Sequence, residues 1–158
     1  MKQLRNRMSV GEILQGARNL LAERWSQGAY VSEDGNEKHS QDNDFGIPDD
    51  DDDCYTYCSD GAMRRMIVNM IRQNRDNMSK SRADRLLVSA QNAVSSSIMK
   101  KAQSSSQGHA ASDIWVWNDA RGRTKEEVLE VFDDAIANNC RVVQQLAGEN
   151  HDNTEEGA

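Results

Sequence analysis

The run Trp117–Thr124 places an indole, an amide, a carboxylate and guanidinium groups close together in the chain. Asn and Asp side chains bond readily to backbone groups two residues ahead, and glycine permits left-handed dihedrals, so the run predicts a tight turn. The alternative is a ligand site, because such groups beside an indole and a helix N-terminus can orient a polar or anionic molecule. The candidate residues are Trp117, Asn118, Asp119 and Arg123.

A second aromatic motif lies at Trp25–Tyr30 and contains Gln27 and Gly28. Glycine can end a helix, and the aromatic rings can close the edge of a core. If Gln27 and Tyr30 instead face the Trp117–Thr124 turn, the two motifs form one pocket. This pairing is a hypothesis, which a separation beyond side-chain reach would remove.

Cys58 stands just before an expected helix start, where a thiol can gain nucleophilic character if its pKa falls. Nucleophilic catalysis also needs a base, and the histidines His39, His109 and His151 fall in expected loops or in the C-terminal tail. We therefore expect Cys58 to be a small buried hydrophobe, and we expect Gly61 to let its helix approach a neighbour closely.

The sequence offers few metal ligands. Cys54 and Cys58 have a spacing that zinc tolerates, yet no second Cys or His pair with ligand spacing follows. The aspartates 49–53 lack the alternating ligands and the central glycine of a calcium-binding hand. The sequence also has no phosphate-binding loop and no serine elbow. We therefore expect no metal, no cofactor and no catalytic residue.

Helices must position these motifs. Capping boxes at Ser9–Glu12 and Thr124–Glu127 predict two helix starts, and apolar residues at three- and four-residue steps follow each. The segment Ile114–Trp117 is the only plausible strand, and we expect it to lie extended on the helices because it is too short to form a sheet. The expected helices run from Ser9 to about Gly28, from Asp60 to about Asn74, from Ser81 to about Ser104 and from Thr124 to about Gly148.

These elements predict a mainly α fold, a compact bundle of about four helices with one short extended segment. The length of 158 residues suits one domain, and a single proline fits helices better than a many-stranded sheet. The expected organisation is an N-terminal tail over 1–8, a single helical domain over 9–147 with an acidic flexible loop at 33–53, and a disordered acidic tail over 148–158.

The net charge of −7 is unevenly distributed. Residues 33–60 contribute −10 and residues 149–158 contribute −4, which leaves +7 for the rest. Basic side chains gather between residues 64 and 85, where they could bind nucleic acid, while the acidic segments could shield them. The candidate residues are Arg64, Arg65, Arg72, Arg75, Lys80, Arg82 and Arg85.

The basic N-terminus is not followed by the apolar stretch of a secretory signal. The longest strongly apolar stretch, residues 66–71, is far shorter than the roughly 20 residues that span a bilayer. Three cysteines in such a chain indicate reduced thiols. We therefore expect a cytoplasmic protein without a membrane segment.

Three motifs together resemble a family of small bacterial and phage proteins known only as a domain of unknown function. The motifs are Trp25–Ala29, Tyr57–Ala62 and Trp117–Thr124, in an order and spacing that match over about residues 9–140. Tyr57 stands where the family usually has Trp, and Arg121 where Pro is common, which makes the turn less rigid here. The resemblance implies a shared fold and a bacterial or phage origin, but no activity.

Three function classes remain open. The first is a non-catalytic interaction or regulatory module with a protein partner, because no catalytic constellation is found. The second is a binder of a small polar or anionic ligand, or of a nucleotide, through Gln27, Tyr30 and the turn. The third is a nucleic-acid-associated protein with acidic autoinhibitory segments. The sequence leaves the oligomeric state open.

Overall fold

Two helices begin at residues that cap them, as expected. In the computed structural model, Ser9 accepts a hydrogen bond from the backbone N–H of Glu12, while Glu12 accepts one from the Ser9 N–H. Thr124 and Glu127 exchange the equivalent pair of bonds. Each pair satisfies backbone donors that a helix start otherwise leaves without partners. Both predicted capping boxes are confirmed.

The structure describes residues 9–38, 43–50, 53–73, 78–104 and 113–149. Most of these residues are helical, which confirms a mainly α fold. The expected N-terminal tail, and the acidic tail from residue 150 onward, lie outside the described residues. The helices are α1 (Val10–Arg24), α2 (Ser59–Gln73), α3 (Lys80–Ser104), α4 (Ile114–Asn118) and α5 (Lys125–Glu149).

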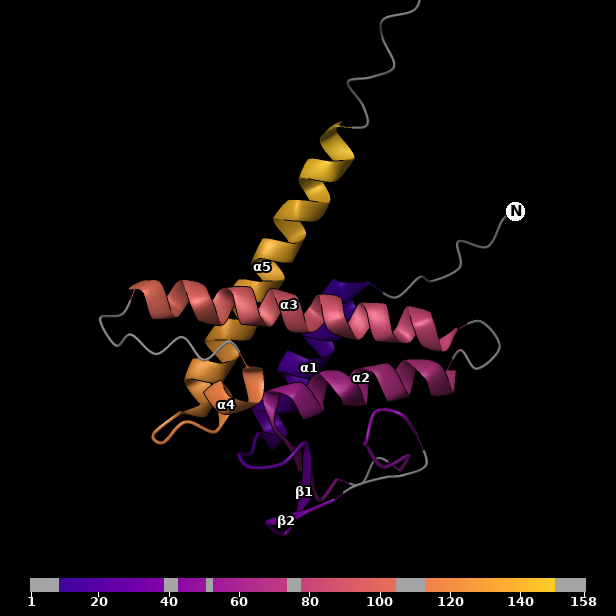
Figure 1. The fold of residues 1–158 in the computed structure, drawn as a ribbon, viewed down its shortest axis with the longest axis vertical. Helices are drawn as coiled ribbons and strands as arrows, with labels where there is room; N and C mark the ends of the chain where they lie inside the picture. Colours follow the sequence, from indigo (N-terminus) through magenta and orange to yellow (C-terminus); the bar gives the residue numbers. More distant parts are fainter. Residues whose placement is uncertain (1–8, 39–42, 51–52, 74–77, 105–112, 150–158) are drawn as a thin grey trace, which may run out of the picture.

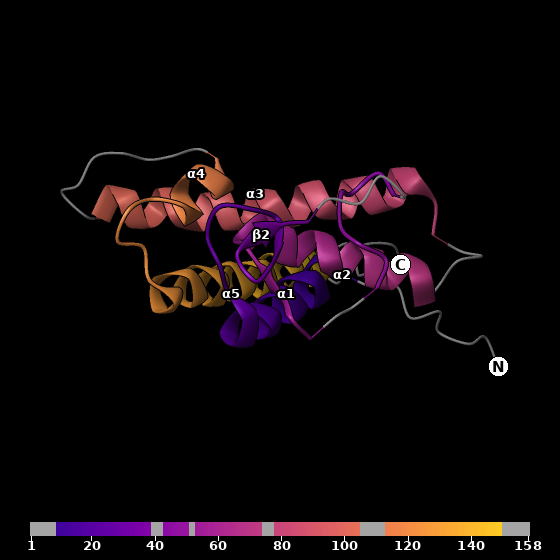
Figure 2. The same ribbon diagram turned by 90° about the horizontal axis from the view of Figure 1, so that it is seen from below.

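Helix α1 lies at the centre of the bundle, in contact with α2, α3 and α5. Helices α2 and α3 lie side by side, and α5 crosses α3 (Figure 1). Figure 2 shows α1 and α5 together in a layer next to α3. Apolar side chains at helical spacing fill the space between these layers, and each helix contributes to one core. Fully buried examples are Leu14, Leu21, Ile67, Val94 and Phe132.

A small antiparallel sheet follows α1 and corrects the expectation of a continuous loop over 33–53. Its strands are β1 (Val31–Glu33), β2 (Asn36–Glu37) and β3 (Tyr55–Tyr57), in the order β2-β1-β3. Asp34 and Gly35 join β1 to β2 with φ angles of 50° and 79°. Two-residue turns with positive φ match the twist of a hairpin, and Asp-Gly is a preferred sequence for them.

The acidic stretch also packs into the core through residues 43–50, which we call the acidic strap. Phe45 is almost completely buried and Ile47 is completely buried. Asn43 holds the strap in a turn, because its side chain accepts from the Phe45 N–H and donates to the Ile47 carbonyl. This part of the expected solvated loop is therefore anchored by apolar side chains. Residues 39–42 and 51–52 lie outside the described ranges.

The segment expected to be extended, Ile114–Trp117, is instead the short helix α4. The Trp117 N–H donates to the Asp113 carbonyl at 3.0 Å, and the Asp119 N–H donates to the Trp115 carbonyl at 2.9 Å. Ile114 and Trp117 are three residues apart and share the buried face, while Trp115 and Val116 face solvent. The apolar run therefore has helical spacing rather than strand spacing.

Helix α5 is longer than the body it packs against. Its core residues end at about Ala135, and from Cys140 to Gln145 all side chains are exposed, including Val142 and Val143. The last turns consequently project beyond the other helices (Figure 1). We expected this helix to stop near Gly148, and it ends at Glu149.

Candidate functional site

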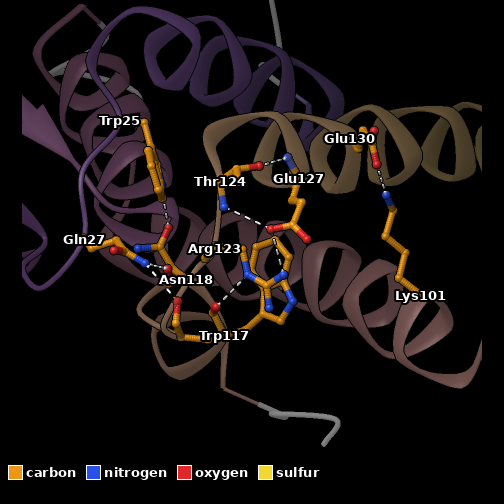
Figure 3. A network of polar contacts seen from close by, with 10 residues as sticks. Trp25, Gln27, Lys101, Trp117, Asn118, Arg123, Thr124, Glu127 and Glu130 are labelled. Atoms are coloured by element: carbon orange, nitrogen blue, oxygen red, sulfur yellow. Dashed lines mark hydrogen bonds and ion pairs between the residues drawn. The ribbon is translucent and has the colours of Figure 1, made fainter. Parts of the chain in front are cut away.

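Asn118, at the end of α4, is the buried centre of a polar network (Figure 3). Its Oδ1 accepts from the Trp25 indole N–H at 2.9 Å, from the Ser59 backbone N–H at 3.2 Å and from the Ser59 hydroxyl at 2.8 Å. Its Nδ2 donates to the Ser26 carbonyl and to Asp119. One amide thus ties the end of α1, the start of α2 and α4 together. We call these contacts the Asn118 network.

The two aromatic motifs lie together, as the pairing hypothesis required. The Gln27 amide donates to the carbonyl of Asn118 at 2.8 Å and to that of Ala120 at 3.2 Å. The Gly28 N–H donates to Asp119 Oδ1 at 2.9 Å. Gln27 therefore bonds to the turn that contains Asn118, and Asn118 bonds to the segment that contains Gln27. Their role in the fold is to fix the turn.

Arg123 belongs to the same turn and is also engaged within the protein (Figure 3). Its guanidinium lies 4.1 Å from the centre of the Trp117 ring, donates to the Trp117 carbonyl, and pairs with Glu127 at 3.2 Å. A stacked guanidinium of this kind is stabilised by the negative face of the indole. Arg123 thus covers Trp117, and neither side chain lines the hollow described below.

Tyr30 is positioned by a close approach of two backbones. A Cβ atom at Gly61, near the start of α2, would lie 1.8 Å from the Tyr30 carbonyl oxygen, so only glycine fits there. This confirms the close approach expected at Gly61. The Tyr30 ring carries the Arg64 guanidinium at 4.4 Å, and Arg64 in turn pairs with the buried Asp60 at 2.9 Å.

Two adjoining depressions, of about 250 and 280 Å³, share Tyr30 and Trp115 in their lining. We call them together the Trp115 hollow. Asp119 lines the first depression, and Asp60 with Arg64 lines the second. Trp115 itself is 54% exposed, which is unusual for so large an aromatic side chain. Of the predicted ligand residues, Tyr30 and Asp119 reach this hollow.

Sequence reasoning named Trp117 and not Trp115 as the candidate indole, because residues two apart in an extended segment share a face and the pattern did not distinguish the two. A helical interpretation of the same four residues would have found it: Ile114 and Trp117 form a buried pair at i, i+3, which leaves Trp115 on the opposite face. The spacing was the available signal.

Cys58 lines the first depression but is 2% exposed. Burial raises the pKa of its thiol to about 12, although hydrogen bonds from the Gly61 and Asp60 backbone partly oppose the rise. A thiol with such a pKa stays protonated at neutral pH and is a poor nucleophile. The expectation of a small buried hydrophobe fits this environment.

The arginine row expected to form a basic face on α2 and α3 is largely occupied by the acidic strap. Arg64 donates to the Phe45 carbonyl at 3.2 Å, Arg65 to the Asp50 carbonyl at 2.8 Å, and Arg72 to the Asp49 carbonyl. The strap therefore shields this part of α2. Lys80 pairs with Asp44, Arg82 is half-exposed, Arg85 is exposed, and Arg75 lies outside the described residues.

Arg65 is completely buried, although sequence reasoning placed it on a nucleic-acid surface. Its Nε donates to the Tyr57 hydroxyl at 3.2 Å, and its Nη1 has no hydrogen-bond partner within the described structure. Its side chain fills the space between α2 and β3, because the alkyl stem and the guanidinium face can pack on Tyr57. In this fold Arg65 cannot contact an external polyanion.

The described ranges contain neither a candidate metal site nor a candidate membrane-spanning helix. No group of three or more His, Cys, Asp or Glu side chains there could hold a metal ion. None of the helices in that part of the chain combines the length and the hydropathy needed to cross a bilayer.

The fold and the hollow together define a small helical domain with a hairpin-containing sheet and an aromatic, carboxylate-lined surface depression. The chain belongs to the family of unknown function DUF6197, whose profile matches residues 5–138. No curated protein is significantly similar to it, and no solved structure is either. The match covers α1 to α4 and the first half of α5, and it stops just before α5 projects from the body.

Proposed function

We propose that this protein is a non-catalytic interaction module that binds a protein partner through the Trp115 hollow. The single observation that carries the proposal is the exposure of Trp115 on the short helix α4. Aromatic side chains are enriched where proteins contact one another, because they bury much area at little cost in conformational entropy. The bacterial or phage origin and the cytoplasmic location stay predictions.

The support beneath Trp115 favours a preformed binding surface. The buried Asn118 network fixes α4 to the ends of α1 and α2, and Ile114 and Trp117 anchor its inner face. A side chain on such a support loses little freedom on binding. The depressions on either side offer space for side chains of a partner.

The shape of the hollow favours a protein partner over a small molecule. Its depressions, of about 250 and 280 Å³, are open to solvent, whereas pockets for small ligands bury most of the ligand's surface. The lining charge also disfavours phosphate. Glu37, Asp60, Asp113 and Asp119 outnumber the single cation, Arg64.

Catalysis is not part of the proposal. Cys58 is the thiol that lines the hollow, and its pKa is raised to about 12. A nucleic-acid role is less well supported than a protein partner, because the arginines of α2 contact the acidic strap.

Site-specific photo-crosslinking in the native host tests the proposal. A photoreactive phenylalanine analogue replaces Trp115 in one variant and Val142 in another, because the two side chains are similarly exposed at 54% and 52%. We expect a discrete adduct with a partner protein from position 115 and none from position 142. Equal labelling at both positions, or no adduct at position 115, would contradict the proposal.

A further inference from the structure

The protein repeatedly places a guanidinium on an aromatic ring. Arg64 lies on Tyr30 at 4.4 Å, and two further pairs join Arg65 to Tyr57 and Arg123 to Trp117. In two of the three pairs a carboxylate completes the arrangement, because Arg64 also contacts Asp60 and Arg123 also contacts Glu127. A ring and a carboxylate together attract a planar cation from both its face and its edge.

Trp115 also has carboxylates nearby, and Arg64 lines one of its two depressions without stacking on the indole. In the described residues no Arg or Lys side chain stacks on its indole, while carboxylates lie in both depressions that it lines. Asp119 commits Oδ1 to two hydrogen bonds, from the Gly28 N–H and from the Asn118 amide. Asp113, at the N-terminus of α4, makes no side-chain capping bond. The depressions are therefore aromatic and net negative.

We infer that the Trp115 hollow takes the guanidinium of an arginine side chain presented by a partner protein. This inference rests on the proposed function and names the chemistry of the partner. The guanidinium stacks on the exposed indole and donates hydrogen bonds to the carboxylates around it, as Arg64 already does with Tyr30 and Asp60. Charge complementarity selects arginine over neutral side chains of the same shape.

Arginine is preferred to lysine for a physical reason. A guanidinium is planar, is weakly hydrated and presents several donors in a fixed fork, so it can stack on a ring and bond a carboxylate at once. An ammonium is compact and strongly hydrated, so its desolvation at a surface site costs more free energy. The resident pairs of this protein all use arginine.

Titration with short blocked peptides tests the inference. The probes are acetyl-Gly-Arg-Gly-amide and the same peptide with citrulline, which has nearly the same shape without the charge. The readout is the NMR signal of the Trp115 indole N–H in the full chain, identified with a Trp115→Phe variant. We expect the arginine peptide to shift this signal with a dissociation constant on the order of 1 mM, as suits one stacked cation with exposed ion pairs.

Two comparisons make the result specific. The citrulline peptide should bind about fivefold or more weakly, because it lacks the cation–π attraction. Binding to Trp115→Leu is followed through the backbone N–H signals of Gly28 and Ala29, which also line the first depression. This variant should bind the arginine peptide more weakly by a similar factor, whereas the exposed Val142→Ser, far along α5, should bind it unchanged. Equal binding of the two peptides, no binding of either, or full binding to Trp115→Leu would overturn the inference.

The outcomes separate this inference from the proposed function. A crosslinked partner at position 115 together with equal binding of the arginine and citrulline peptides would leave an interaction module whose partner uses another group. Arginine binding without any adduct at position 115 would instead contradict the protein partner.

Discussion

The Asn118 network and the contacts of α2 with the acidic strap both join segments that are distant in the sequence, but they do so with different hydrogen bonds. Both tie distant segments together through polar side chains, of which Asn118 and Arg65 are completely buried. Every polar atom of the Asn118 side chain has partners, although the neighbouring Ser26 hydroxyl has none in the described structure. Arg65 itself leaves its buried Nη1 group without a partner there. The network also bonds side chain to side chain, while the strap is held by its carbonyl oxygens.

This difference implies that the Asn118 network supports Trp115 rigidly, whereas the acidic strap covers α2 more loosely. A buried amide whose polar atoms all have partners favours one geometry, because any shift leaves several groups without partners. Carbonyl contacts to flexible arginines allow more adjustment, and an unsatisfied buried N–H group costs free energy in the folded state. We therefore expect the turn beneath Trp115 to be rigid and the acidic strap to be the more adaptable element.

The largest expected effect concerns Cys58, which lies directly before the Ser59 partner of Asn118. With its pKa raised from 9.0 to about 12, its thiolate population near neutral pH falls about a thousandfold. A thiol reagent should label the exposed Cys54 and Cys140 quickly and Cys58 at least that much more slowly. Three thiols reacting together would show that the network opens readily.

The same pKa shift gives a pH dependence with a definite sign. Below about pH 9 the thiol is protonated in both the folded and the unfolded chain, so its contribution to stability is fully present. Between about 9 and 12 the unfolded chain loses the proton and the folded chain keeps it, so stability falls as pH rises. Denaturation of wild type and Cys58→Ala across this range should show a steeper loss for wild type.

Asn118→Ala should give the second largest effect. The substitution removes the acceptor of the Trp25 indole and of both Ser59 donors, and each unsatisfied buried donor costs about 1–3 kcal/mol. We expect a loss of more than about 3 kcal/mol in the free energy of unfolding, measured with urea. The exposed Asn92→Ala on α3 serves as the control. A loss below about 1 kcal/mol would contradict the view that the Asn118 network is the more rigid region.

Arg65→Met should be much milder. It removes the bonds to Tyr57 and to the Asp50 carbonyl, but it also removes a buried charge and its unpartnered N–H. Apolar replacement of buried charged groups is often close to neutral, so we expect a loss below about 2 kcal/mol. Arg65→Ala, which leaves a cavity, should cost more. If Met proved as harmful as Asn118→Ala, the two regions would be equally rigid.

Lys80→Ala should have the smallest effect. The Lys80–Asp44 pair is 2.8 Å long, but both side chains are 63% exposed, so water and salt screen their attraction. We expect no measurable change in the melting temperature, at low or at high salt. The apolar anchors Phe45 and Ile47 hold the strap instead. A clear, salt-dependent loss would show that surface charge secures it.

Local signals in the sequence predicted the helices well. Both capping boxes and the apolar periodicity place α1, α2, α3 and α5 to within a few residues. The pairing of Gln27 with the Asn118 turn was a hypothesis from the polar and aromatic side chains of both motifs, and the structure brings the two together. The hairpin was missed although Asp34-Gly35 signals it, since the surrounding acidic composition suggested a loop.

Other features depend on contacts that no local pattern records. The burial of Arg65 depends on the Asp50 carbonyl group, 15 residues away, and on the Tyr57 ring, and only the folded chain brings them together. The exposure of Trp115 could be predicted only if residues 114–117 were assigned to a helix. Over four residues, helical and strand periodicity are hard to distinguish.

The projecting end of α5 has a practical consequence. Helical turns without tertiary contacts open and close at little free-energy cost, so amide hydrogens beyond Asn139 should exchange with solvent much faster than those near Phe132. Proteases should also cut there first, without unfolding the body. Because the family match stops at residue 138, this end offers a place to attach an immobilisation tag away from the shared fold.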